Sequence, residues 1–248
     1  MTTAIVSGAI ITGCGGGGGS STQSSLQRGL IHQWKFDGDA NDAVGNLSTV
    51  PTGPVGYTPG PTGQAIVFNG TSTGISLPSS PDMMFQNSFT LSAWANLYSY
   101  PTNSQIWATI IFCGDDRNGL DPYDLQVAPD GTLQFLTTSA TQAAGANGPT
   151  KFPLNQFVLV TGTYDKSTGV QTLYVNGAMV SKNIHENNLT PVVPLDPTAN
   201  PGVGIGTNNA FGVSGYNMGW NGAIGDLRIY NRALSASEVR ALYNQVSH

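Results

Sequence analysis

The chain has 248 residues and a net charge of −5, and only 9% of its residues are charged although glycine and proline are frequent. This size suits one large all-β domain, and the negative charge argues against a protein that binds nucleic-acid phosphates. No apolar run in the sequence is long enough to cross a bilayer. The two cysteines, Cys14 and Cys113, do not imply a disulfide framework. Few charges and many Thr, Ser, Asn and Gly favour a virion surface or an extracellular setting.

Residues 1–28 predict an extended N-terminal arm, because Gly15–Gly19 and the polar residues after it are typical of a flexible linker. Two interpretations of the arm stay open. Ile11-Thr12-Gly13-Cys14 resembles a bacterial lipobox with Cys14 as the lipidated residue, although no Lys or Arg precedes it. We favour an uncleaved arm whose apolar runs add a strand to the sheet edge of a partner or of another subunit. The folded domain is then expected to span residues 29–248.

The first predicted strand leads into an acidic loop. Gly29–Phe36 alternates at strand spacing. The loop that follows, Asp37–Asn46, is dense in carboxylates and amides, and Asp37, Asp39 and Asp42 could together hold a hard cation such as Ca²⁺. The alternative is a set of Asx turns, in which these side chains bind their own backbone.

The next segments predict a loop and then three strands. Residues 47–64 are rich in Pro and Gly without periodicity, so a loop is expected. Ala65–Leu77 predicts two strands around a turn at Asn69-Gly70. Ser88–Tyr98 alternates strictly, with apolar residues at its odd-numbered positions, which predicts a strand with one buried face. We expect Trp94 on the other face to pack in the protein rather than to support a sugar.

The densest acidic cluster follows a predicted buried strand at Ile106–Phe112. Its candidate ligand-binding residues are Asp115, Asp116, Asn118, Asp121 and Tyr123. Such side chains could bind a sugar by hydrogen bonds to its hydroxyl groups and by stacking on the tyrosine ring. They also have some likeness to a calcium-binding turn, but they lack the spacing and the terminal Glu of an EF-hand. A solvated loop is the third interpretation.

Two hairpins are expected in the middle of the chain. Leu125–Thr137 predicts one of them, and Ala140–Pro153 is then expected to be a Gly/Ala/Pro loop. The central hairpin has strands at Phe157–Tyr164 and Gln171–Val175, and Asn176-Gly177 is a strong turn signal at its end. Because one face of this hairpin is apolar, a second sheet must cover it.

The C-terminal part predicts a loop, a strand and a helix. Glu186–Gly202 is expected to be a Pro-rich loop, and Trp220–Tyr230 the last strand. Ser235 followed three residues later by Glu238 is a capping box, which predicts a short helix and assigns Glu238 to capping rather than to catalysis. The apolar stripe of this helix consists of Val239, Leu242, Tyr243 and Val246.

Five motifs, taken in order, resemble laminin G-like domains of the concanavalin A-like lectin/glucanase superfamily. They are W-x-F-D-G at 34–38, A-x-x-F-N-G at 65–70, F-T-L-S-A-W at 89–94, the central hairpin F-x-x-V-x-x-T-Y-D with L-Y-V-N-G, and residues 220–243. The resemblance implies an all-β, antiparallel two-sheet jelly-roll sandwich with one short C-terminal helix. It also implies a structural calcium ion, for which Asp226 joins Asp37, Asp39 and Asp42 as a candidate ligand.

The resemblance specifies the fold more than the function, because that superfamily includes lectins, glycosidases and structural modules. We expect a non-catalytic adhesion module that is displayed by its arm and binds a glycan or a cell-surface receptor. The setting we favour is a phage virion, as capsid decoration, fibre or tail attachment, and the arm could also link copies into a homo-oligomer.

Two alternatives remain from the sequence. One is a bacterial surface lipoprotein with the same glycan-binding domain. The less favoured one is a glycoside hydrolase, which requires a pair of carboxyl groups at the scissile bond. Relatives with glucanase activity place closely spaced Glu and Asp on one strand, whereas this chain has two Glu, Glu186 and Glu238, and no Glu-x-Asp-x-x-Glu pattern.

Overall fold

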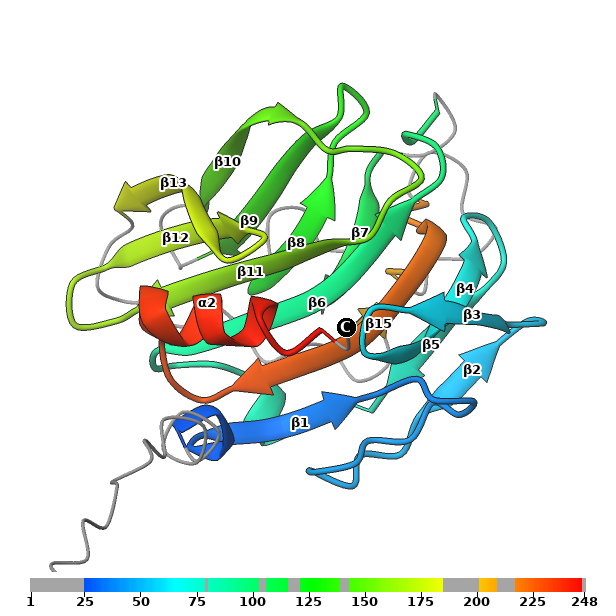
Figure 1. The fold of residues 1–248 in the computed structure, drawn as a ribbon, viewed down its shortest axis with the longest axis horizontal. Helices are drawn as coiled ribbons and strands as arrows, with labels where there is room; N and C mark the ends of the chain where they lie inside the picture. Colours follow the sequence, from blue (N-terminus) through cyan, green and yellow to red (C-terminus); the bar gives the residue numbers. More distant parts are fainter. Residues whose placement is uncertain are drawn as a thin grey trace, which may run out of the picture.

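The strands form two stacked antiparallel sheets, which Figure 1 shows in a computed structural model of the protein. The expected antiparallel two-sheet sandwich is therefore confirmed. The structure describes residues 25–78, 80–102, 106–115, 121–138, 143–184, 201–208 and 217–246.

Within these residues, eight strands form the first sheet, called sheet A, in the order β13-β12-β11-β6-β15-β4-β3, and β1 pairs with β15 beside β4. The bounds are β1 Leu30–Trp34, β3 Gly56–Gly60, β4 Gly63–Asn69, β6 Phe89–Leu97, β11 Val158–Asp165, β12 Val170–Val175, β13 Ala178–Ile184 and β15 Asn221–Tyr230.

Seven strands of the described residues form sheet B in the order β10-β9-β8-β7-β14-β5-β2. The bounds are β2 Val50–Thr52, β5 Gly74–Leu77, β7 Ala108–Asp115, β8 Tyr123–Val127, β9 Thr132–Thr138, β10 Ala143–Lys151 and β14 Pro201–Ile205. A 3₁₀ turn, η1 at Pro81–Met83, and helix α2 at Ala236–Tyr243 complete these elements. No helix in the described part of the chain is long and apolar enough to cross a membrane.

The main core lies between the two sheets, and the alternation along the strands builds it as expected. The odd-numbered residues of β6, from Phe89 to Leu97, all belong to this core. In the central hairpin Leu173 points into the core, whereas its neighbour Tyr174 belongs to a second cluster on the other face of sheet A. Asn176 and Gly177 have φ values of 50° and 75°, as a type I′ turn requires.

Three strands lie in stretches that were expected to be loops, and the expectation was wrong there. β2 and β3 lie within residues 47–64, and β10 lies within 140–153. All three are at sheet edges, since β3 ends sheet A and β2 and β10 end sheet B. A proline cannot donate a hydrogen bond to the ladder, but an edge strand pairs on one side only and therefore tolerates Pro51 and Pro59.

Helix α2 covers part of the outer face of sheet A, the face turned away from sheet B (Figure 1). The capping box of Ser235 and Glu238 is present as predicted. Val239 and Leu242 are buried in a cluster that includes Trp94, which is 5% exposed. Trp94 thus packs beneath the helix, as expected, and offers no face to a sugar.

The segment Ser25–Arg28 belongs to the folded domain, upstream of the boundary expected at Gly29. Leu26 is fully buried in the cluster beneath α2. Arg232 donates from Nη2 to the carbonyl oxygen of Ser25 and from Nε to that of Arg28, at 2.7 Å in both cases. The folded unit therefore begins no later than Ser25, and the arm with its lipobox-like segment lies outside the described residues.

The same arginine ties this segment to helix α2. Arg232 donates from Nη1 and Nη2 to the two carboxylate oxygens of Glu238, each at 2.9 Å. Burial alone would raise the pKa of Glu238, but the hydrogen bonds from Arg232 and Ser235 outweigh it and lower the pKa to about 2. Glu238 is therefore ionised over the ordinary pH range, and its carboxylate is hydrogen-bonded to Arg232 and Ser235. These properties make it unsuited to acid–base catalysis.

Candidate functional site

Strands β1 and β4 pair with the same edge of β15, one after the other, and leave a gap between them. β4 pairs with Asn221–Ile224, and β1 pairs with the stretch Leu227–Tyr230. Gly225 and Asp226 lie between these stretches. On the other edge of β15, Gly225–Arg228 lies opposite the shorter segment Ser92–Trp94 of β6, so β15 carries one extra residue. A β-bulge of this kind bends the strand and re-aims its side chains, and such bulges are frequent beside functional sites.

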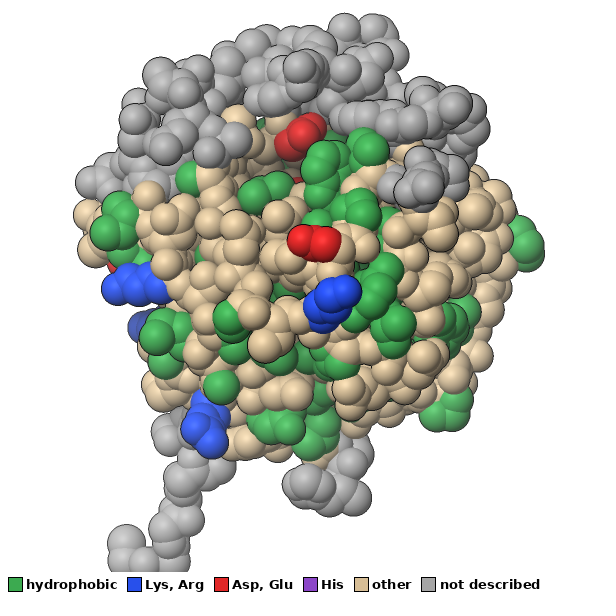
Figure 2. All heavy atoms as spheres, turned by 90° about the horizontal axis from the view of Figure 1, so that it is seen from above, with side chains coloured by type: hydrophobic (Ala, Val, Ile, Leu, Met, Phe, Trp, Pro, Cys, Tyr) green, Lys and Arg blue, Asp and Glu red, His purple; other side chains and the backbone are tan. Residues whose placement is uncertain are grey.

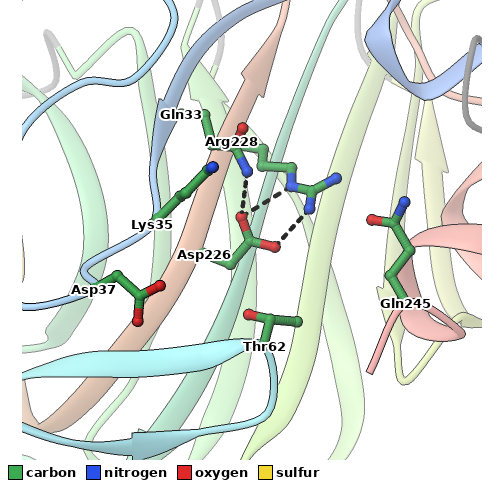
Figure 3. A pocket seen from close by; sticks show the side chains of 7 residues that line it. All are labelled: Gln33, Lys35, Asp37, Thr62, Asp226, Arg228 and Gln245. Carbon is green, nitrogen blue, oxygen red and sulfur yellow. Dashed lines mark hydrogen bonds and ion pairs between the residues drawn. The ribbon is translucent and has the colours of Figure 1, made fainter. Parts of the chain in front are cut away.

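A cavity of about 460 Å³ lies at this gap, on the outer face of sheet A (Figure 3). Its walls come from β1 and the residues just after it, the β3–β4 turn, β15 and the segment after α2. Every lining residue is polar, and we call the cavity the β15-bulge pocket: Gln33, Lys35, Asp37, Thr62, Asp226, Arg228 and Gln245. Its volume falls within the range of about 300 to 1,000 Å³ that is typical of small-molecule sites.

An ion pair fixes the β15 wall of the pocket. Arg228 donates from Nε and Nη2 to the two carboxylate oxygens of Asp226, at 2.9 and 2.7 Å. The amide of Gln33 also donates to Asp226, at 2.7 Å. Burial alone would lower the pKa of Arg228, but the carboxylate of Asp226 raises it above its usual value. The guanidinium of Arg228 is therefore held in place against Asp226.

The neighbouring wall, formed by the residues after β1, has an unusual backbone conformation. Phe36 has a φ of 58°, which is rare for a bulky side chain, and its ring is fully buried in the main core. Its neighbours Lys35 and Asp37 are exposed and line the pocket. Asp226, which lines the pocket from β15, also has a positive φ, of 42°. Strained residues are frequent at functional sites, and one of these two lines the pocket while the other lies between two of its lining residues.

The acidic loop after β1 uses Asp42 to organise its own backbone. The Oδ1 atom of Asp42 accepts from the backbone N–H groups of Gln33, Val44 and Gly45, at 3.0 to 3.1 Å. Its Oδ2 atom accepts from Leu47 N at 3.1 Å and from His32 Nδ1 at 2.7 Å. Burial alone would raise the pKa of Asp42, but these hydrogen bonds lower it.

The expected calcium ligands do not converge on one site. Asp37 and Asp226 line the same pocket, but Lys35 and Arg228 line it too, and the repulsion of two cations disfavours Ca²⁺ there. Asp39 accepts from the backbone N–H of Asn41 at 3.0 Å, as in an Asx turn. Among the described residues, no group of three His, Cys, Asp or Glu side chains lies close enough to hold a metal. The donor set that the structure describes therefore does not fit a calcium ion.

The second predicted cluster is only partly within the described residues. Asp116 and Asn118 lie outside them, as does the side chain of Asp115 at the end of β7. Asp121 is half-buried just before β8. Tyr123 is 1% exposed and its ring packs among aromatic side chains of the core. Burial therefore raises the pKa of Tyr123 and leaves its ring no face on which a sugar could stack.

The sequence named two of the pocket residues, Asp37 and Asp226, but as candidate calcium ligands, and it missed the others. Gln33, Lys35 and Asp37 are polar residues at alternate positions, at the end of β1 and just after it, and all three line the pocket. This alternation of polar residues was a usable signal. Thr62 carried none, because it lies in a stretch that was expected to be an irregular loop.

A family model described as the concanavalin A-like lectin/glucanases superfamily matches residues 69–240. The match includes Asp226 and Arg228 and excludes the other five residues that line the β15-bulge pocket. Most of this pocket is therefore built from parts of the chain outside the matched segment. No curated protein matches the chain at a significant level.

Several solved structures share the fold. Domain 4 of AbnA, a GH43 extracellular arabinanase from Geobacillus stearothermophilus in complex with arabinotriose, is 24% identical, with a TM-score of 0.66 over 86% of this chain and 98% of that one. The binding domain of botulinum neurotoxin serotype D/C is 16% identical, with a TM-score of 0.67 over 90% and 53%. A botulinum neurotoxin type C structure, titled for cell entry that depends on two ganglioside molecules, is 14% identical, with a TM-score of 0.66 over 91% and 53%. The chain spans about half of each neurotoxin chain.

Proposed function

Because the chain belongs to the concanavalin A-like lectin/glucanase superfamily, we propose that it is a non-catalytic binding module that recognises a glycan through the β15-bulge pocket. The observation that carries this proposal is a cavity of small-molecule size whose lining is polar throughout. A sugar presents many hydroxyl groups, which need such hydrogen-bonding partners. The arabinotriose complex and the ganglioside-dependent neurotoxin support a glycan as the ligand class.

The state of the carboxyl groups supports binding rather than hydrolysis. Glycoside hydrolysis uses two carboxyl groups, one of which needs a raised pKa to act as an acid. In the pocket, Asp226 is engaged by Arg228 and Gln33, and Asp37 accepts from the backbone N–H of Gln64. Burial raises the pKa of Asp124, but this residue is 3% exposed, binds Thr109 and does not line the pocket.

The arm gives the proposed module its means of display on a phage virion. The described part of the chain begins with Ser25–Arg28, which is fixed to the domain by Leu26 and Arg232. This segment precedes β1, and Gln33 near the end of β1 is the first residue of the chain that lines the pocket, so about 15 to 20 Å of extended chain separates Arg28 from Gln33. A partner bound to the arm would thus leave the pocket accessible. Among the described side chains that Figure 2 shows, few are charged.

A glycan array tests the binding function. We expect the full-length chain to bind at least one oligosaccharide class and to leave every bound oligosaccharide intact, since both carboxylates of the pocket are already engaged by hydrogen bonds within the fold. Mass spectrometry of the glycans after incubation measures the second point. Absence of binding across neutral and charged glycans would contradict the proposal, and cleavage of a bound glycan would show an enzyme instead.

Deletion of residues 1–24 tests the display role. We expect the truncated chain to lose attachment to its particle and to keep the thermal unfolding midpoint of the full chain, because the segment from Ser25 onward is retained. Comparison of purified particles by immunoblot measures attachment. Unchanged incorporation of the truncated chain would show that the arm does not anchor the protein.

A further inference from the structure

The β15-bulge pocket contains two positive and two negative side chains, and they play different roles. Asp226 and Arg228 form a closed pair through two hydrogen bonds of 2.7 and 2.9 Å, so each largely satisfies the other. Lys35 and Asp37 come from the segment just after β1, the strand that pairs with β15 (Figure 3). The charge of the pocket as a whole is therefore balanced, while one cation and one carboxylate remain in reach of a ligand.

The atoms that Lys35 and Asp37 offer to a ligand are complementary. Lys35 has no ion pair within the described residues, so its ammonium group can donate up to three hydrogen bonds. Asp37 accepts from Gln64 N at 2.9 Å through Oδ1, which leaves Oδ2 as an acceptor. Thr62 and Gln245 face these groups across the cavity, and each can both donate and accept (Figure 3).

From this arrangement, and resting on the proposed function, we infer that the pocket takes a neutral sugar unit rather than a uronic acid or an amino sugar. Neighbouring hydroxyl groups of a neutral sugar can accept from Lys35 and donate to Asp37. A ligand carboxylate would be attracted by Lys35 but repelled by Asp37, and a ligand ammonium would meet the reverse. Because the two effects offset each other, a charged ligand gains little from the pocket charges while it loses part of its water shell, which favours a neutral sugar.

Charge variants of the pocket test this inference. Calorimetry measures the affinities of the wild type and of each variant for galactose, galacturonate and galactosamine, with the best neutral glycan of the array as the reference ligand. The wild type is expected to bind the neutral sugar at least 10-fold more tightly than either charged one. Asp37→Asn keeps the acceptor for Gln64 N but gives the pocket a net positive charge. We expect it to raise the affinity for galacturonate relative to galactose about 10-fold. Lys35→Gln should shift the preference toward galactosamine by a similar factor.

Matched variants elsewhere control for changes in overall charge. Asp130→Asn replaces an exposed carboxylate that also accepts a backbone N–H, from Thr132, and Lys182→Gln replaces an exposed lysine of β13. Both controls should keep the wild-type preference. The preference for a neutral sugar would be wrong if the wild type preferred galacturonate or galactosamine, or if the pocket variants behaved as the controls do. Either result would leave the proposed function standing. A wild type that binds no glycan would instead overturn the proposed function.

Discussion

Replacement of Asp42 by alanine is expected to lower the free energy of unfolding by about 3 kcal/mol or more. The carboxylate of Asp42 accepts four backbone N–H groups and the Nδ1–H group of His32, which is itself fully buried. Without this acceptor, two buried donors in β1 and three part-buried donors in the loop after it would lose their partner, and each unsatisfied buried donor costs about 1 to 3 kcal/mol. Urea denaturation of the two proteins at pH 7 measures the difference.

The effect of this variant should depend on pH. The pKa of Asp42 is lowered in the folded protein from an ordinary value of 3.8. A carboxyl group with a lowered pKa stabilises the folded state at pH values above its ordinary pKa. This stabilisation is lost as the pH falls through the pKa of the group in the folded protein. The difference in the free energy of unfolding between wild type and Asp42→Ala should therefore be largest at pH 7 and should decrease below about pH 3.8. Asp39→Ala, which removes an exposed acceptor of one N–H group, is the matched control. Equal losses for the two variants would contradict the role assigned to Asp42.

Replacement of Thr62 by tryptophan is expected to weaken glycan binding by about 100-fold or more, which corresponds to about 2.7 kcal/mol. Thr62 lies in the turn between β3 and β4 and lines the pocket opposite the ion pair of β15 (Figure 3). An indole ring at this position would fill the space of a ligand without removing a hydrogen bond from the fold. Stability should change by no more than about 0.5 kcal/mol, as is usual for surface substitutions.

Thr168→Trp supplies the matched control for this prediction. Thr168 is exposed in the turn between β11 and β12 and lines no described pocket. Calorimetric titration of both variants with the best glycan from the array should show lost binding for Thr62→Trp and unchanged binding for Thr168→Trp. If Thr62→Trp bound as the wild type does, the ligand site would lie elsewhere.

The parts of the fold that were predictable from sequence are those that local patterns determine. The strict alternation of β6 fixes which residues enter the core, and the positive φ values of Asn176 and Gly177 explain why that pair marks a turn. Helix α2 begins where the capping box of Ser235 and Glu238 places it. Each of these signals acts within a few residues, so it is visible without knowledge of the tertiary structure.

The edge strands and the pocket depend on distant parts of the chain, and sequence reasoning failed there. Pro51 and Pro59 suggested a loop, because only the sheet order shows that their strands have a free side. The pocket brings the end of β1 next to Asp226 and Gln245, and each of these two residues lies about 200 residues after β1 in the sequence. The density of carboxylates around Asp42 left a cation and a set of Asx turns both open, and the structure shows that Asp42 satisfies backbone donors. Counting acidic residues could not distinguish these two uses.

The most direct test of the account is a crystal structure of the full chain with the neutral glycan that binds most tightly. We predict electron density for one sugar unit in the β15-bulge pocket, with hydroxyl groups within hydrogen-bonding distance of Lys35 Nζ and Asp37 Oδ2. A sugar bound instead at the cluster around Asp121, with the β15-bulge pocket holding none, would contradict the assignment of the site.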